Sequence, residues 1–183
     1  MSIPSRLRLA VYYVLVSLKL RELRDRFGRL RIESPAQHSK DSGMQQVGDL
    51  CLWIGNCREA RDFTLIQSEG FQAVVDLAYE EPVGSPSRDV TLLRVPIIDG
   101  TGNSRLQLEL VVSTVQRCLE LKLKTLVACS YGMSRSPLIV SAAMARMQGV
   151  TFQNALEIVS SIRKVDCSPA LYQELNALSS STE

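Results

Sequence analysis

The sequence is short of the residues that build metal sites and disulfide frameworks. Its one histidine is His38. Its five cysteines are Cys51, Cys57, Cys118, Cys129 and Cys167. These positions follow neither the paired spacing of a disulfide framework nor the spacing of zinc ligands. We therefore expect reduced thiols, a cytoplasmic setting and no metal.

The sequence also lacks an apolar run long enough for a membrane span. The run Leu9–Val16 is too short to cross a bilayer, and no clear small-residue cleavage site follows it. Residues 1–32 carry eight Lys or Arg and two acidic residues, a net charge of +6, whereas the rest of the chain carries −4. We expect a basic and apolar helix that docks on the domain. Two alternatives are peripheral contact with an anionic membrane and a cleaved signal peptide.

Composition changes along the chain predict its domain organisation. Residues 33–46 are rich in Ser, Gln, Pro and Gly, which is typical of a polar linker. We expect one domain over residues 47–178 and a short tail over residues 179–183. The hydrophobic content of 45% is sufficient for one packed core.

The hydrophobic pattern of the domain alternates between strands and helices. Strands are expected over residues 49–55, 73–77, 92–98 and 125–128, and helices over residues 57–69, 106–121, 137–148, 151–164 and 170–178. Asn56 and Glu59 have the spacing of a capping box at the first of these helices. This order predicts a three-layer α/β domain with a central mixed, mostly parallel sheet flanked by helices.

The most informative stretch joins the strand at residues 125–128 to the helix that follows. Cys129 and Arg135 are separated by five residues, and Gly132 is the third of them. Glycine tolerates the positive φ of a tight loop whose N–H groups point inward, and a helix N-terminus adds partial positive charge. Arginine can bind two phosphate oxygens at once, and a thiol in such a field is drawn toward the nucleophilic thiolate. The pattern predicts a phosphate cradle with a nucleophile, the alternative being a structural cysteine and a surface arginine.

A phosphate ester needs an acid to protonate its leaving oxygen. Asp99 follows an expected buried strand, precedes Gly100 and Gly102, and lies thirty residues before Cys129. We predict that Asp99 is this acid. The alternatives are an aspartate that only serves the turn, and a weaker candidate acid, Asp76.

The spacing Cys129-x5-Arg135-Ser136 resembles the signature loop of the cysteine-dependent protein tyrosine phosphatases, and Gly-Met-Ser-Arg-Ser-Pro most resembles their dual-specificity branch. The stretches Leu-Trp-Ile-Gly-Asn and Gly-Phe-Gln-Ala-Val-Val-Asp-Leu are also similar to that branch, so the resemblance covers roughly residues 47–178. The sequence departs from the family at Ala128, where a histidine is usual. In the family this histidine helps to orient the loop and to keep the thiol ionised.

The resemblance implies a phosphatase-like fold and a metal-independent hydrolase that forms a cysteinyl-phosphate and needs no cofactor. By the same resemblance, Cys129 is the nucleophile, Arg135 holds the phosphate, Asp99 is the acid, and Ser136 assists the departing sulfur. Ser136 is also an ordinary helix N-cap residue, and both readings stay open. The expected phosphate-binding loop consists of Ser130, Tyr131, Gly132, Met133, Ser134 and Arg135.

The loop residues Ser130, Tyr131, Met133 and Ser134 are uncharged. This favours a phosphorylated protein, on Tyr or on Ser/Thr, as substrate, and we expect no nucleic-acid partner. Two other functions stay open: a catalytically weakened phosphate-binding pseudophosphatase, to which Ala128 points, and a phosphatase for a lipid phosphate. The basic residues 1–32 favour the lipid alternative because they could contact a membrane.

Overall fold

The computed structural model describes residues 43–180 of the chain. The helix expected over residues 1–32, most of the linker and the tail from residue 181 lie outside the described residues. None of the helices between residues 43 and 180 combines the length and the apolar character needed to cross a bilayer.

The domain is built on one five-stranded sheet with the order β1-β2-β5-β3-β4. The strands are β1 (Gln45–Gln46), β2 (Leu52–Asn56), β3 (Ala73–Ala78), β4 (Thr91–Ile97) and β5 (Thr125–Cys129). Only the β1–β2 pair is antiparallel in this sheet; β2–β5, β5–β3 and β3–β4 are parallel. The two residues of β1 lie in the range for which composition predicted a linker, so the domain begins earlier than we expected.

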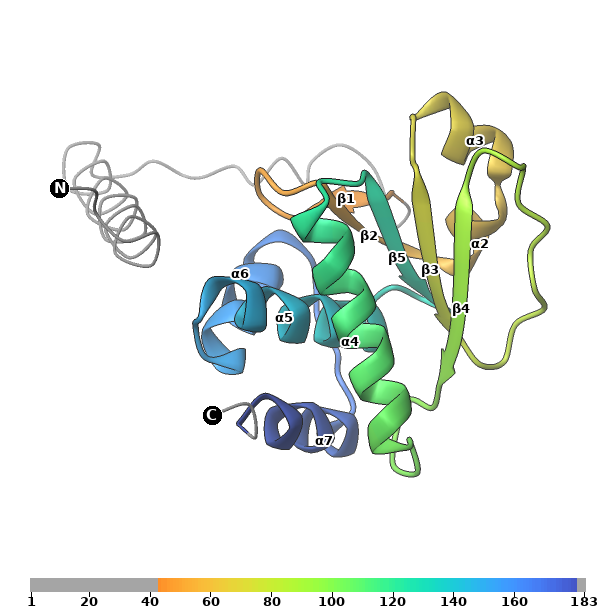
Figure 1. Cartoon of the computed structure of the whole chain (residues 1–183). Helices are drawn as coiled ribbons and strands as arrows, with labels where there is room; N and C mark the ends of the chain where they lie inside the picture. Colours follow the sequence, from red (N-terminus) through yellow and green to blue (C-terminus); the bar gives the residue numbers. More distant parts are fainter. Residues whose placement is uncertain (1–42, 181–183) are drawn as a thin grey trace, which may run out of the picture. The chain divides into compact units, whose positions relative to one another are not determined.

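Helices cover both faces of the sheet, which confirms the predicted three-layer α/β architecture (Figure 1). Every residue of β3 and β5 is buried, because these central strands are covered from both sides. Their sequences, Ala-Val-Val-Asp-Leu-Ala and Thr-Leu-Val-Ala-Cys, are correspondingly almost continuous apolar runs.

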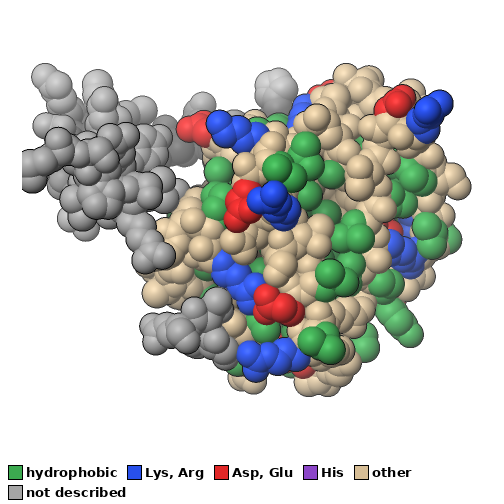
Figure 2. Space-filling view, viewed as in Figure 1, with side chains coloured by type: hydrophobic (Ala, Val, Ile, Leu, Met, Phe, Trp, Pro, Cys, Tyr) green, Lys and Arg blue, Asp and Glu red, His purple; other side chains and the backbone are tan. Residues whose placement is uncertain are grey.

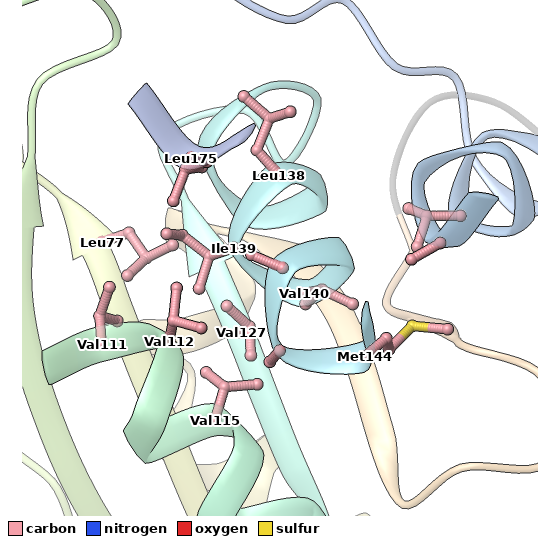
Figure 3. Close-up of a cluster of buried hydrophobic side chains, with 14 of the residues drawn as sticks. Leu77, Val111, Val112, Val115, Val127, Leu138, Ile139, Val140, Met144 and Leu175 are labelled. Carbon is pink, nitrogen blue, oxygen red and sulfur yellow. The ribbon is translucent and has the colours of Figure 1, made fainter. Parts of the chain in front are cut away.

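The larger core lies between the sheet and four helices. These are α4 (Arg105–Glu120), α5 (Arg135–Gln148), α6 (Phe152–Ile162) and α7 (Pro169–Ser180). The apolar positions that predicted α4 are all buried: Leu108, Val111, Val112, Val115, Cys118 and Leu119. Figure 3 shows side chains of α4 meeting Val127 of β5, Leu77 of β3, Ile139 of α5 and Leu175 of α7. Helix α5 is therefore held at the centre of the core.

The other face of the sheet carries two short helices, α2 (Cys57–Arg61) and α3 (Phe63–Ser68). The capping box of Asn56 and Glu59 is present as predicted. The prediction of a single helix up to residue 69 is wrong, because Asp62 separates two helices. Asp62 is the C-cap residue of α2 and also the N-cap residue of α3, where its side chain accepts a hydrogen bond from the amide of Leu65. A second, smaller apolar cluster lies here and includes Ala128.

Candidate active site

The predicted cradle lies between β5 and α5. Strand β5 ends at Cys129, and α5 begins at Arg135, so residues 130–134 form the loop between them. Because β3, β4 and β5 are parallel, their carboxyl ends meet at the same edge of the sheet. The residues that follow β3 and β4 therefore contact the loop.

All four carbonyls of the loop residues 130–133 are hydrogen-bonded away from its centre. Backbone amides bind two of them: that of Cys57 donates to the oxygen of Ser130 (3.4 Å), and that of Asp166 to the oxygen of Met133 (3.0 Å). The side chain of Arg163 binds the oxygens of Tyr131 (3.4 Å) and Gly132 (2.6 Å). The described part of the chain has no cis peptide, and in a trans peptide the N–H points away from its C=O. The following amides therefore face the inside of the loop.

Cys129 lies at the base of this loop and is only 2% exposed. Its Sγ accepts a hydrogen bond from the amide of Gly132 at 3.2 Å. Gly132 has φ +72°, and a Cβ there would lie 2.6 Å from Nη2 of Arg163 and 2.7 Å from the carbonyl oxygen of Gly55. Both the conformation and the crowding therefore require glycine at position 132.

Arg135 is 3% exposed and is held on one edge of its guanidinium. Its Nη1 donates to Oε2 of Glu80 (2.9 Å) and to the carbonyl of Ile97 (3.0 Å), and its Nη2 donates to Oγ of Ser130 (2.8 Å). That Oγ in turn donates to the same Oε2 of Glu80 (2.9 Å). The edge formed by Nη1 and Nη2 thus faces Glu80 and Ser130.

The opposite edge of this guanidinium has no partner among the described residues. Nε of Arg135 is buried and has no hydrogen-bond partner among the described residues. Of the five N–H groups of an arginine, the contacts above use three, which leaves Nε–H and one Nη2–H. Two adjacent N–H groups of this kind fit two oxygens of a phosphate.

The structure brings Asp99 to the same loop. The hydroxyl of Ser134 donates to Oδ1 of Asp99 at 2.6 Å and accepts a hydrogen bond from the amide of Ser168 at 3.3 Å. Asn103 fastens the turn that carries Asp99: its Oδ1 accepts from the amide of Ile98, and its Nδ2 donates to the carbonyls of Ile98 and Gly100. The rival candidate Asp76 is buried in β3, where its Oδ1 accepts from the amide of Ala78.

Ser136 is the second residue of α5 and is fully buried. The N-cap reading of Ser136 is wrong, because the N-cap position of α5 belongs to Ser134. The Ser136 hydroxyl makes no hydrogen bond with any described residue, so its predicted contact with the sulfur of Cys129 is not formed here.

Sequence reasoning missed two charged residues of the site, Glu80 and Arg163. Partial burial acts to raise the pKa of Glu80, but hydrogen bonds from Arg135, from its own backbone and from Ser130 outweigh it and lower that pKa. Burial lowers the pKa of Arg163, against the opposing effect of the negative charges of Glu59 and Cys129. Neither residue stands in a recognisable motif. Glu80 follows the expected strand 73–77 by three residues, and Arg163 lies within the helix expected over residues 151–164. The structure ends these elements at Ala78 and Ile162, so that each residue follows an element directly or by two positions.

Apolar side chains flank the cradle. Tyr131, in the loop itself, is 76% exposed, and Tyr79 beside Glu80 and Ile98 beside Asp99 are also exposed. Met133, the remaining loop residue, is half-buried. Exposed apolar side chains therefore lie beside the exposed Glu80 and Asp99.

Between residues 43 and 180, no group of three or more His, Cys, Asp or Glu side chains is arranged to hold a metal ion.

Comparison with known proteins identifies the family of the chain. A model of the dual specificity phosphatase catalytic domain matches residues 52–179, so the chain belongs to the dual specificity phosphatase family. The chain is similar to mouse dual specificity phosphatase 28, with 30% identity over 115 residues, which are 62% of this chain and 70% of the relative. Human dual specificity phosphatase 28 is 27% identical over 126 residues, 68% of this chain and 71% of the relative.

The fold has solved counterparts. A crystal structure of a mouse dual specificity phosphatase complexed with zinc tungstate superposes with a TM-score of 0.67 at 25% identity. The match covers 78% of this chain and 91% of the mouse chain. The family and the fold predicted from the signature loop are thus confirmed.

Proposed function

We propose that this phosphatase hydrolyses phosphomonoesters of protein side chains through a cysteinyl-phosphate on Cys129. The single observation that carries the proposal is that one loop contains both a buried sulfur and a buried unpaired donor. The sulfur of Cys129 accepts a hydrogen bond from an amide, and Nε of Arg135 has no partner among the described residues. An unpaired buried donor is costly, and a bound oxyanion would satisfy it.

In the first step the Cys129 thiolate attacks phosphorus, so that the S–P bond forms and the P–O bond of the ester breaks. Loop amides and the free edge of Arg135 bind the equatorial oxygens, on which negative charge spreads. Asp99 gives its proton to the leaving oxygen. Its contact with Ser134 supports this role, because it holds the carboxyl group beside the loop through one oxygen and leaves the other oxygen for the ester.

In the second step water attacks the phosphorus of the cysteinyl-phosphate. The O–P bond forms, the S–P bond breaks, and Asp99 takes the proton from the water. We assign Ser136 to the departing thiolate: its hydroxyl is buried and unpaired among the described residues, so a rotation about χ1 could bring it to the sulfur.

The substrate class follows from the residues around the cradle. The loop residues from Ser130 to Ser134 are uncharged, and Tyr131 and Tyr79 expose aromatic rings. Aromatic surface suits the side chain of a phosphorylated peptide better than a polyanionic head group. On the face shown in Figure 2, Lys and Arg side chains lie beside Asp and Glu side chains and form no patch of one sign. The uncharged loop residues and the exposed rings favour phosphoproteins over lipid phosphates.

Ala128 supports one alternative, a protein that binds phosphate but turns it over poorly. Its methyl group is fully buried in the smaller apolar cluster, on the face of the sheet that carries α2 and α3. The side chain at position 128 therefore offers the loop no polar group.

Hydrolysis of an aryl phosphate in the presence of EDTA separates these functions. Wild-type protein should hydrolyse the ester, Cys129→Ser should lose nearly all turnover, and the control Cys51→Ser, altered at the opposite end of the sheet from the cradle, should not. Turnover by Cys129→Ser at the wild-type rate would contradict the mechanism. Binding of tungstate without hydrolysis by the wild type would favour the binding protein.

A further inference from the structure

The side chain of Arg163 ties the signature loop to the first two strands. Arg163 follows the last residue of α6, and its side chain is half-buried. Its Nε donates to the carbonyl of Gly132 (2.6 Å), and its Nη2 to that of Tyr131 (3.4 Å). Its Nη1 donates to the carbonyl oxygens of Gly43 (3.2 Å) and Ile54 (3.5 Å) and to Oε1 of Gln45 (3.4 Å). Each nitrogen of the guanidinium is therefore used.

The two loop contacts fix two peptide planes. The carbonyl of Tyr131 belongs to the same peptide as the amide of Gly132, and this amide donates to Sγ of Cys129. Because the two groups point in opposite directions, holding the carbonyl outward aims the amide at the sulfur. The carbonyl of Gly132 and the amide of Met133 are related in the same way. Arg163 thus orients two of the four inward-facing amides.

The guanidinium of Arg163 occupies the space that a side chain at position 132 would need. A side chain at position 132 would collide with Arg163 before any other described group, at 2.6 Å. Position 128, next to the nucleophile, carries a methyl group among apolar side chains. The hydrogen bonds to the other two loop carbonyls come from the backbone amides of Cys57 and Asp166. They add no formal charge, whereas Arg163 places a cation behind the sulfur.

We propose that Arg163 is a positioning residue, which holds the signature loop in its anion-binding form and favours the thiolate of Cys129 through its charge. This proposal rests on the proposed function, because it assigns the loop to an incoming phosphate. The side chain of Arg163 acts through the backbone of the loop and does not have to contact the substrate.

Other charges around Cys129 do not replace this cation. The titratable and charged groups on the elements packed around the sulfur are Asp76 in β3, Glu80 and Glu81 after β3, Asp99 after β4, Cys57, Arg58, Glu59 and Arg61 in α2, Tyr131 in the loop, Arg135 and Arg146 in α5, and Arg163 after α6. Arg61 is paired with Glu81 at 3.2 Å. Arg135 is paired with Glu80 at 2.9 Å, so its charge is partly compensated. Among the described residues no carboxylate lies within ion-pair distance of Arg163, on which the charge of Glu59 acts only from farther away.

Two substitutions separate the charge of Arg163 from its hydrogen bonds. Arg163→Met removes both and keeps much of the volume; Arg163→Lys keeps the charge and loses the fork. The control is Arg146→Met, because Arg146 is also a half-buried arginine. It lies near the end of α5 that is far from the cradle and binds Glu109 of α4. Thermal melts of all three show whether each variant folds.

The first measurement is alkylation of Cys129 by iodoacetamide between pH 4 and pH 9, followed on the Cys129 peptide by mass spectrometry. For Arg163→Met we expect the midpoint to rise by about one pH unit, which is roughly a tenfold loss of thiolate below the midpoint. For Arg163→Lys and Arg146→Met we expect the wild-type midpoint. A purely structural role for Arg163 would lower the melting temperature without this shift.

The second measurement is the Kd of tungstate, used as a phosphate analogue. Arg163→Met and Arg163→Lys should both bind about tenfold more weakly, because two amides lose their orientation; Arg146→Met should not. A wild-type midpoint and Kd in folded Arg163→Met would overturn the proposal. If that variant does not fold, unchanged tungstate affinity in Arg163→Lys overturns it. A wild-type protein that hydrolyses no phosphate ester would contradict the proposed function. Alkylation needs no turnover, so the midpoint of alkylation would still show whether Arg163 affects the thiol.

Discussion

The substitution Arg135→Lys tests whether the free edge of the guanidinium binds the reacting phosphate. Arg135 makes three hydrogen bonds, to Glu80, Ile97 and Ser130, and these leave Nε–H and one Nη2–H for the substrate. A lysine ammonium can approach Glu80 from the same helix position, but it cannot present two parallel donors on its other side.

The size of the effect follows from the number of donors that are lost. A hydrogen bond to a charged group contributes about 1.5–3 kcal/mol, so the loss of two in the transition state amounts to about 3–6 kcal/mol. At 25 °C this corresponds to a decrease of kcat/KM by roughly 10²–10⁴-fold. The lower part of this range is expected if the ammonium retains one contact with the phosphate.

The assay is kcat/KM for an aryl phosphate at 25 °C, with a thermal melt of the same preparation. Arg146→Lys is the matched control, because Arg146 lies in the same helix and binds both oxygens of Glu109 away from the cradle. We expect turnover of the control within about twofold of wild type. A folded Arg135→Lys protein that keeps kcat/KM within tenfold of wild type would refute the assignment of the free edge.

Three further predictions concern other parts of the chain. Asp99→Asn should slow esters with poor leaving groups by about 10²-fold or more and good ones far less; equal losses would remove Asp99 from the acid role. Hydrogen bonds from Arg146 lower the pKa of Glu109 although partial burial opposes them, so this carboxylate stabilises the fold above its unfolded pKa and ceases to do so as the pH falls through its lowered pKa. Glu109→Gln should therefore reduce the difference in melting temperature between pH 7 and pH 3, and an unchanged difference would contradict this. Deletion of residues 1–32 should lower the melting temperature if they dock on the domain; a normal melt with loss of binding to anionic vesicles would instead favour the membrane.

The architecture was predictable because it follows from local patterns. The stripe of apolar residues in α4 and the continuous apolar runs of β3 and β5 report burial directly. The signature loop was predictable because its members lie within seven consecutive residues, from Cys129 to Arg135. The prediction of Asp99 required one further step, the expectation that a phosphate ester needs an acid on another loop near the cradle.

The partners of the loop were not predictable, because the contacts that fix them are distant in sequence. Glu80 is 55 positions from Arg135, and the neighbouring Glu81, identical in type, binds Arg61 instead. Arg163 is 31 positions from Gly132, and from the sequence alone the neighbouring Lys164 is an equally good candidate for contact with the loop. Nothing in the composition distinguishes the two members of either pair; only the direction in which the chain leaves β3 or α6 does.

The contacts of the loop with the rest of the domain hold the arrangement that the proposed mechanism needs. Four carbonyls of the loop are turned outward, Gly132 donates to the sulfur, and Arg135 is bound through its Nη1 and Nη2. Under that mechanism, binding an oxyanion would require little reorganisation of this loop, which is the condition under which oriented dipoles stabilise a transition state most. Asp99 is the exposed exception, since its carboxyl group depends on the single hydroxyl of Ser134 and on the turn fastened by Asn103. Differences in rate among substrates should therefore depend mainly on how each ester meets Asp99, whereas phosphate affinity should depend mainly on the loop.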